Sequence, residues 1–250
     1  MFGALLLVTS TVYAADNSIY INQAGSSSTI NLKQDGSANK IYGVGDSAGT
    51  AATFTGGSQD IDIRQIGASN LLGIDVNSTV VSGTGVELTY IITGSNSVAS
   101  IDINGDGLGT AANNKIDIRQ TGDYSDLIFD LLGSGNELTA STTGGTLNDL
   151  TFDIDADDIT TVIAVSGGGG NKTTMTLSTD DSTVNYTGVG ASNQVTLTQS
   201  GTGGALGHNF DLDITGSSNT VTTTQSGNAK YDTDINITGS TNTWTILQEQ

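Results

Sequence analysis

The chain has 250 residues, 34 of them glycine, with no proline, no cysteine and a formal net charge of −19 at neutral pH. The absence of cysteine excludes a disulfide framework and thiolate metal sites. The acidic excess argues against a nucleic-acid partner or an anionic membrane surface, since both demand a basic face. Aromatic residues make up 5% of the chain, too few for an ordinary two-layer domain, yet aliphatic and polar residues alternate too regularly for disorder. A solenoid of thin rungs fits this composition.

The first 14 residues resemble the end of a secretory signal peptide. Residues 2–8 are a short apolar run, and residues 12–14 form a small-x-small cleavage motif followed by Ala15. We therefore expect residues 1–14 to be a signal peptide and residues 15–250 to be one repeat domain, exported from the cell. The alternative is that the segment is a first buried strand. It is too short to span a bilayer, and no other stretch approaches that length, so membrane insertion is not expected.

A repeat begins directly after this segment. Its two halves are each 11 residues long, and apolar residues alternate within them at Ile19 and Ile21, then at Ile30 and Leu32. Alternation is the period of a β-strand, and a glycine two residues after each glutamine marks a turn. The unit therefore predicts a rung of strand, turn and strand. Its framework positions are Asn17, Gln23, Gly25, Ser28, Gln34, Gly36 and Asn39.

The same template recurs to the end of the chain, although some half-units carry an aliphatic residue in place of glutamine. We count about twenty half-units, which predicts an all-β solenoid of about ten rungs with two facing parallel sheets. Four irregular stretches, residues 43–57, 77–85, 105–113 and 201–208, are predicted to be insertions at rung corners. The aliphatic replacements are Ile92, Ile154, Ile214 and Ile237.

Glutamine shares the parity of the apolar residues, so it is expected to face the interior. A buried amide is costly unless it is hydrogen-bonded, and a second amide on the next rung, about 4.8 Å away, would satisfy it. We therefore predict an amide ladder like those of cross-β structures. The predicted ladder comprises Asn17, Gln23, Ser28, Gln34, Asn39, Gln65, Asn70, Asn114, Gln120, Asn193, Gln199, Asn219, Gln225, Asn242 and Gln248. The predicted turn glycines are Gly25, Gly36, Gly67, Gly122, Gly201 and Gly227.

This pattern resembles the curlin family, the subunits of curli, which are amyloid fibres of bacterial biofilms. The family pattern is Ser-x5-Gln-x-Gly-x2-Asn-x5-Gln; here Asn17 or Ser28 stands at the serine position and Gln23 and Gln34 at the glutamines. The resemblance covers most of residues 17–250. It implies a secreted, self-associating pilus-like fibre on the cell surface, which serves adhesion and biofilm, with a minor nucleating subunit and outer-membrane export machinery as partners. The family's targeting segment is missing, since only Ala15 and Asp16 precede the repeats.

Both ends of the repeat carry full strands, residues 18–23 and 243–248, with no proline to block an edge. Matching open ends predict head-to-tail growth, a contact that does not close on itself. We therefore expect a structural fibre subunit and not an enzyme. The alternatives are a monomeric β-solenoid adhesin and a carbohydrate-binding or carbohydrate-active solenoid.

Catalytic, cofactor and metal sites are not expected. His208, the only histidine, is predicted to be an exposed loop residue. The segment Asp102-Ile-Asn104-Gly-Asp106-Gly matches the opening of a calcium loop, but its twelfth position is Asn113 and not glutamate.

Residues 173–176 and 220–224 resemble the threonine strands of ice-binding solenoids, with a spacing that drifts. Tyr20, Tyr42 and Trp244 are expected on the surface. Acidic residues at the outward parity should favour assembly at low pH or with cations; they include Asp60, Asp62, Asp117, Asp153, Asp155, Asp157, Asp158, Asp211 and Asp213.

Overall fold

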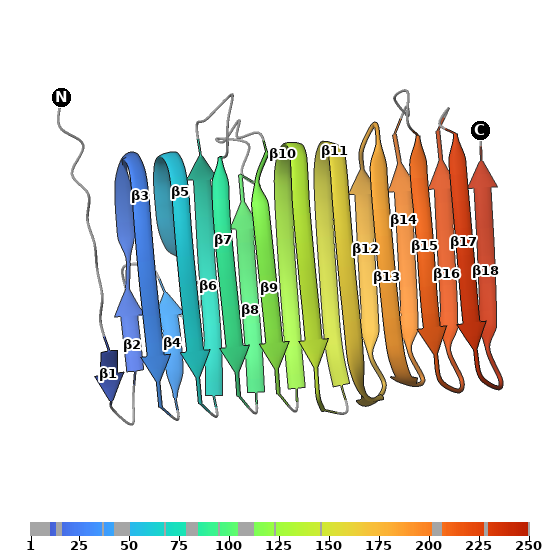
Figure 1. Ribbon diagram of the computed structural model, residues 1–250, viewed down its shortest axis with the longest axis horizontal. Helices are drawn as coiled ribbons and strands as arrows, with labels where there is room; N and C mark the ends of the chain where they lie inside the picture. Colours follow the sequence, from blue (N-terminus) through green and yellow to red (C-terminus); the bar gives the residue numbers. More distant parts are fainter. Residues whose placement is uncertain are drawn as a thin grey trace.

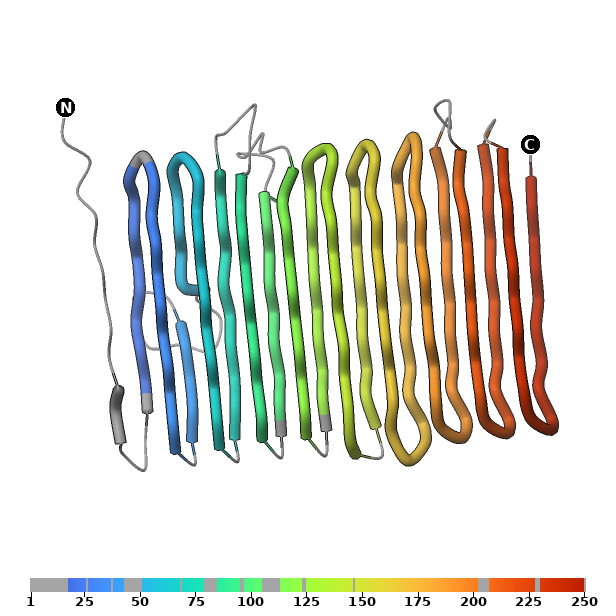
Figure 2. The backbone as a smooth tube through the Cα atoms, in the orientation of Figure 1, coloured from blue at the N-terminus to red at the C-terminus, as the bar shows by residue number. Residues whose placement is uncertain are grey.

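Parallel β-strands account for the regular structure of the described residues, and no helix occurs among them. These residues form a parallel β-solenoid of about eight turns, which confirms the expected all-β solenoid. Figure 1 shows the rungs following one another along a single axis, and Figure 2 traces the backbone that connects them. The computed structural model describes residues 11–13, 17–36, 38–42, 51–67, 69–78, 85–94, 96–104, 113–122, 124–145, 147–201, 207–227 and 230–249.

The strands form two layers, which we name the odd sheet and the even sheet after the strand numbers in each. The odd sheet contains β1 (Thr11–Tyr13), β7 (Val86–Thr93), β9 (Lys115–Thr121), β13 (Ser182–Ala191), β15 (His208–Thr215) and β17 (Tyr231–Thr238). The even sheet contains β2 (Asn17–Tyr20), β4 (Asn39–Tyr42), β6 (Ser69–Ser78), β8 (Asn96–Ile103), β12 (Lys172–Ser178), β14 (Gln194–Ser200), β16 (Thr220–Ser226) and β18 (Thr243–Glu249). Four long strands begin in the even sheet and end in the odd sheet: β3 (Asn22–Asp35), β5 (Ala52–Ile66), β10 (Tyr124–Thr143) and β11 (Leu147–Gly169).

The core lies between the two sheets because every second residue of a strand points inward. β15 shows this alternation without interruption, from buried His208 to exposed Thr215. Aliphatic residues from both sheets form one continuous cluster along the axis. Aromatic residues fill it in places: the rings of Phe129 and Phe152, on adjacent rungs, have centroids 6.1 Å apart. Each rung therefore buries a narrow layer, and neighbouring rungs cover one another's layer.

Glycine is required at the corners because successive rungs approach closely there. Gly67 has a φ of 148°, and a Cβ at this position would overlap the carbonyl oxygen of Gly36 on the preceding rung. Gly201 has a φ of 158°, and a Cβ there would overlap the carbonyl oxygen of Thr179. Of the other predicted turn glycines, Gly25 lies inside β3, where that strand passes from the even to the odd sheet.

Two of the predicted insertions are shorter than expected at their edges. β5 begins at Ala52, so residues 52–57 of the first insertion belong to a strand, because they continue the parallel pairing between β3 and β6. Residues 77 and 78 likewise end β6. Residues 43–50, 79–84, 105–112 and 202–206, which make up most of the predicted insertions, lie outside the described residues.

Part of the predicted signal segment forms a strand. Residues 11–13 make up β1, which pairs in parallel with residues 33–35 of β3 and so lies over one edge of the odd sheet. Residues 1–10 and 14–16 lie outside the described residues. Within the described part of the chain, no helix is long and apolar enough to cross a membrane.

Candidate functional site

The predicted amide ladder begins in the odd sheet with two glutamines. Gln65 Nε2 donates a hydrogen bond to Gln34 Oε1 at 2.7 Å, and both side chains are fully buried. We call residues that occupy the same position on successive rungs a column. Ile92 follows Gln65 in this column, so it offers no amide, and the hydroxyl of Tyr90 donates to Gln65 Oε1 instead, at 2.7 Å. Gln120 follows beyond Ile92, and neither of its amide atoms has a partner in the described structure. The odd-sheet ladder therefore stops after two amides.

The even sheet carries its glutamines at its two ends. Gln225 Nε2 donates to Gln199 Oε1 at 3.2 Å, and Gln248 Nε2 donates to Gln225 Oε1 at 2.8 Å. Gln23 stands in the same column near β2, where it is followed on the next rung by Phe54. The positions between are apolar: Phe54, Val76, Ile103, Leu131, Ile154 and Leu177.

The longest ladder consists of asparagines at one corner of the even sheet. Each side-chain amide nitrogen donates to the Oδ1 of the next rung, with distances of 2.8, 2.9, 3.0 and 3.2 Å. Asn148 and Asn171 were not among the predicted site residues, because no glutamine follows them, although Asn171 precedes Asn193 by one 22-residue period. The members are Asn148, Asn171, Asn193, Asn219 and Asn242.

The other predicted polar residues do not join a side-chain ladder. Asn39 Nδ2 donates to the carbonyl of Ile66, and Asn114 Oδ1 accepts from the backbone N–H of Val86 at 3.0 Å. In the described structure, Ser28 Oγ and both amide atoms of Asn70 have no partner. The side chain of Asn17 lies outside the described residues.

His208 is buried, so the expectation of an exposed loop residue is wrong. It begins β15 with 1% of its surface exposed, because its column places it at an inward position between Ser182 and Tyr231. Its Nδ1 lies 3.0 Å from Ser182 Oγ, and its ring stacks on Tyr231 with centroids 5.5 Å apart. Burial lowers the pKa of His208, and the charges of Asp181 and Asp180 oppose that shift. Ser182 is also buried and accepts from Gln199, so the serine–histidine pair is closed to a substrate.

The two ends of the solenoid expose core positions. At one end, a hollow of about 260 Å³ is lined by residues 19–23 with Ile30 and Leu32. At the other, a hollow of about 550 Å³ is lined by β17 and β18, including Ile235, Ile237 and Trp244. Trp244 is 62% exposed, as expected of a surface residue, although it stands over Val221 in an inward column; no described strand covers it.

The other two aromatic residues expected on the surface differ from each other. Tyr20 is 42% exposed, whereas Tyr42, its partner on the next rung, is buried at 6%. The expectation is therefore wrong for Tyr42, although its parity along the strand is outward. Parity indicates the direction of a side chain, and burial depends in addition on what covers it.

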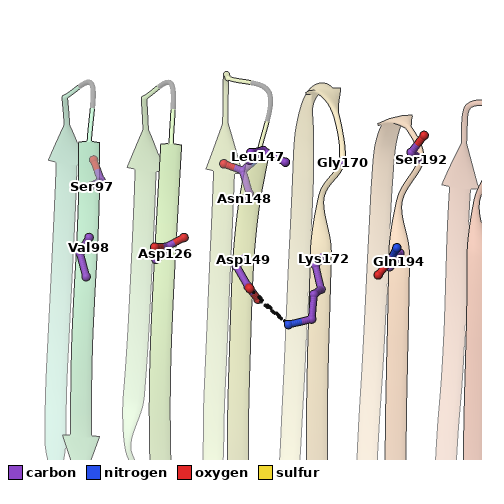
Figure 3. A pocket seen from close by; sticks show the side chains of 10 residues that line it. All are labelled: Ser97, Val98, Asp126, Leu147, Asn148, Asp149, Gly170, Lys172, Ser192 and Gln194. Carbon is purple, nitrogen blue, oxygen red and sulfur yellow. Dashed lines mark hydrogen bonds and ion pairs between the residues drawn. The ribbon is translucent and has the colours of Figure 1, made fainter.

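A shallow groove crosses the outer face of the even sheet from β8 to β14 (Figure 3). Its volume is about 680 Å³, and its lining mixes apolar Val98 and Leu147 with polar side chains. Lys172 Nζ lies 3.2 Å from Asp149, and Figure 3 shows the two side chains pointing toward each other. Burial and the charge of Asp149 raise the pKa of Asp126 on the preceding rung. The groove offers carboxylate, amide and hydroxyl groups to an extended polar ligand.

Acidic residues stack on the outer face of the even sheet. Burial, and then the charges of Asp102, Asp153 and Asp155, raise the pKa of Asp130. We name this column of one aspartate per rung the acidic column: Asp75, Asp102, Asp130 and Asp153.

The predicted calcium loop places its third residue inward. Asn104 is buried, its Oδ1 accepts from the backbone N–H of Ser78 at 2.8 Å, and its Nδ2 donates to the carbonyl of Leu132. Asp106 lies outside the described residues. Within the described ranges, no cluster of three or more His, Cys, Asp or Glu side chains could hold a metal ion.

Comparison with protein-family models, with curated proteins and with solved structures finds no match for this chain. Its function is therefore inferred from its own residues and contacts.

Proposed function

We propose that this protein is the structural subunit of an extracellular, amyloid-like fibre of the curli type, in which copies join head to tail and each adds about ten rungs to one stack. The observation that carries the proposal is the pair of open ends. Inward-facing residues of β2 and β3 line one end, inward-facing residues of β17 and β18 line the other, and both hollows are apolar in part. A contact between the two ends is heterologous, so it propagates as a fibre.

Continuing the columns across such a junction brings matching side chains together. The register places Gln23 of an incoming copy over Gln248, Ile21 over Ile246, and Ile19 over Trp244. In the last rungs each Gln Nε2 donates to the Oε1 of the preceding rung. With the same polarity, Gln23 Nε2 of the incoming copy would donate to Gln248 Oε1. The junction therefore extends both the hydrogen-bond ladder and the apolar core.

The outer columns at this junction avoid contacts between like charges. In the odd sheet Asp232 would meet Thr29 and Asp234 would meet Asn31, and in the even sheet Glu249 would meet Ala24. Like charges directly opposite each other on neighbouring strands are destabilising. The ends are thus more compatible with each other than the acidic rungs inside the chain are with their own neighbours.

Removal of the predicted signal segment would favour this assembly. β1 pairs with residues 33–35 at the edge of β3 that an incoming β17 would occupy. Cleavage after Ala14 during export would free that edge in the mature chain. Cell-surface adhesion, a biofilm matrix role, a nucleating subunit and an export machinery follow from the curli-type proposal.

The first test is whether residues 15–250, purified as a monomer, assemble into fibres. We expect unbranched fibres in negative stain, thioflavin fluorescence and a diffraction spacing of about 4.7–4.8 Å along the fibre. A chain that stays monomeric for days at high concentration, at pH 4 and at pH 7, would contradict the proposal.

A second test addresses the junction itself. Replacing Gln23 alone by alanine leaves Oε1 of Gln248 in the neighbouring copy without its junction donor, at about 1–3 kcal/mol. We expect elongation from wild-type seeds to slow by about tenfold or more. Gln120→Ala is the matched control, since that amide is buried inside the chain and has no described partner. Equal slowing by the control would show that the ends are not the growing surfaces.

A second candidate function, carbohydrate binding by a monomeric adhesin, is favoured by the groove in Figure 3. Its carboxylates, amide and hydroxyls could hydrogen-bond an extended polysaccharide lying along the axis. Calorimetric titration of the monomer with soluble polysaccharides tests it. Binding that is lost in Lys172→Ala, in a chain that forms no fibres, would favour this function over the fibre.

A further inference from the structure

The outer face of the even sheet carries a regular block of hydroxyl side chains between β12 and β16. Adjacent rungs are in register, so the hydroxyls lie about 4.8 Å apart along the axis and roughly 6.6 Å apart along each strand. In β18 only Thr245 continues the block, since Leu247 and Glu249 stand over Thr224 and Ser226. We name the block the threonine face; it consists of Thr174, Thr176, Ser178, Thr196, Thr198, Ser200, Thr222, Thr224 and Ser226.

This alignment corrects the expectation that the threonine spacing drifts. Thr174 and Thr196 are 22 residues apart in the sequence, whereas Thr196 and Thr222 are 26 apart. The additional residues fall between the end of β14 and the start of β15, at a rung corner. The strands themselves keep their register, and their pairing shows no shift from β12 to β18.

The threonine face is uncharged in a chain whose net charge is −19. The residues that alternate with its hydroxyls are buried, so the face stands on a packed layer. The opposite, odd-sheet face of the same rungs is different, because it exposes Asp211, Asp213, Asp232 and Asp234. Charge therefore opposes the close approach of a second acidic molecule less at the threonine face than at the outer face of β15 and β17.

We propose that the threonine face is a lateral contact, on which the threonine face of a second copy in a neighbouring fibre packs. The inference rests on the proposed fibre. Two identical faces share one repeat distance, so the side chains of one can interdigitate with those of the other, as in the dry interfaces between paired cross-β sheets. A hydroxyl can both donate and accept, so each Thr or Ser can bond to a counterpart under a two-fold axis.

The size of the face makes this contact depend on polymerisation. Three strands and five positions along each cover roughly 15 by 20 Å, far below the ~800 Å² per partner of a stable interface. Two monomers would therefore not stay together through it. In a fibre the face recurs once per subunit, and many weak contacts on one rigid stack add up through avidity.

The test uses a charge placed at the centre of the face. Thr198 is exposed on β14, and Thr198→Asp leaves the core and both ends unchanged. The matched control is Thr215→Asp, the same change at an exposed threonine of β15 on the odd sheet. We expect wild-type and Thr215→Asp fibres to form bundles, and Thr198→Asp fibres to elongate at the wild-type rate but remain single. Bundled mass pelleted at low speed should fall at least tenfold.

Each other outcome overturns the proposal. Bundling by Thr198→Asp at the wild-type level, or equal loss in the control, would show that the face is not the contact. Wild-type fibres that remain single would overturn the lateral contact and leave the fibre proposal standing. Single fibres whose monomers partition into growing ice would assign the face to crystalline water. If no fibre forms, the proposed function fails, and the lateral contact fails with it.

Discussion

The outer face of the even sheet changes character between β11 and β12, although the core beneath it does not. One column of this face reads Asp102, Asp130 and Asp153 on successive rungs, and then Thr176, Thr198 and Thr224. The inward residues on both sides of the change are buried and belong to one cluster. Stacking is therefore specified by the inward positions, while the outward positions are open to a local role.

The two regions should respond differently to their surroundings. In the acidic column, parallel register places carboxylates about 4.8 Å apart, where they repel one another. In the threonine face the same register places neutral hydroxyls in a lattice. On this outer face, acid and salt should therefore act mainly on the acidic column, and contacts with other molecules mainly on the threonine face.

The largest expected effect tests whether the core is equally important on both sides of the change. Phe152→Ala, beneath the acidic column, should lower the free energy of unfolding by about 3–5 kcal/mol, and Leu197→Ala, beneath the threonine face, by about 2–5 kcal/mol, because each leaves a cavity. The measurement is urea denaturation. Their outward neighbours, half-buried Thr151 and exposed Thr196, should stay within about 0.5 kcal/mol of wild type when changed to alanine. A core change tolerated on one side only would show that the core is not equally important beneath the two regions.

A histidine makes the threonine region sensitive to acid. Burial lowers the pKa of His208, so as the pH falls below about 6.5, the ordinary histidine pKa, the unfolded chain binds a proton that the folded chain does not. Stability of the rungs around β13, β15 and β17 should therefore decrease from pH 7 toward pH 5. Hydrogen exchange by rung measures this, and His208→Gln should abolish the change. Ser182, Tyr231, Asp180 and Asp181 face or surround the ring and are unchanged in the variant.

The acidic column should respond in the opposite direction. The pKa of Asp130 is raised, so the folded chain binds its proton first, and stability increases as the pH falls through that folded value. Asp130→Asn should remove this pH dependence and stabilise the protein at pH 7 by about 0.2–1 kcal/mol, since like charges across strands are unfavourable. Thr198→Asn, a change in the threonine face, serves as the control. A destabilised Asp130→Asn chain would show that the repulsion is not the dominant effect.

Salt should produce the smallest effect. Raising the ionic strength from about 0.01 M to about 0.15 M shortens the screening length from about 30 Å to about 8 Å, which weakens repulsion between exposed aspartates only in part. We expect slightly higher stability and shorter assembly lag times for the wild type. The salt response should be smaller when Asp130 and Asp153 are both changed to asparagine. Lag times independent of ionic strength would contradict this view.

Much of the fold could be predicted because strand parity is a local property. Ile19, Ile21, Ile30 and Leu32 indicate by their spacing alone which face is inward, and all four lie in the core or pack against it. The glutamines at the same parity could likewise be placed inside. What each glutamine meets depends on the neighbouring rung, so the partners of Gln65 and the isolation of Gln120 could not be predicted.

The sequence by itself indicated an all-β solenoid, because apolar and polar residues alternate within a short unit that repeats along the chain, and stacking such units buries their apolar faces. The tertiary structure decided the columns, since two residues stack only when the lengths of the intervening corners bring them into register. That register placed His208 between Ser182 and Tyr231, joined Asn148 and Asn171 to the asparagine ladder, and aligned the threonine face. Hydrogen bonds between rungs, and not the local chain, hold these residues in place.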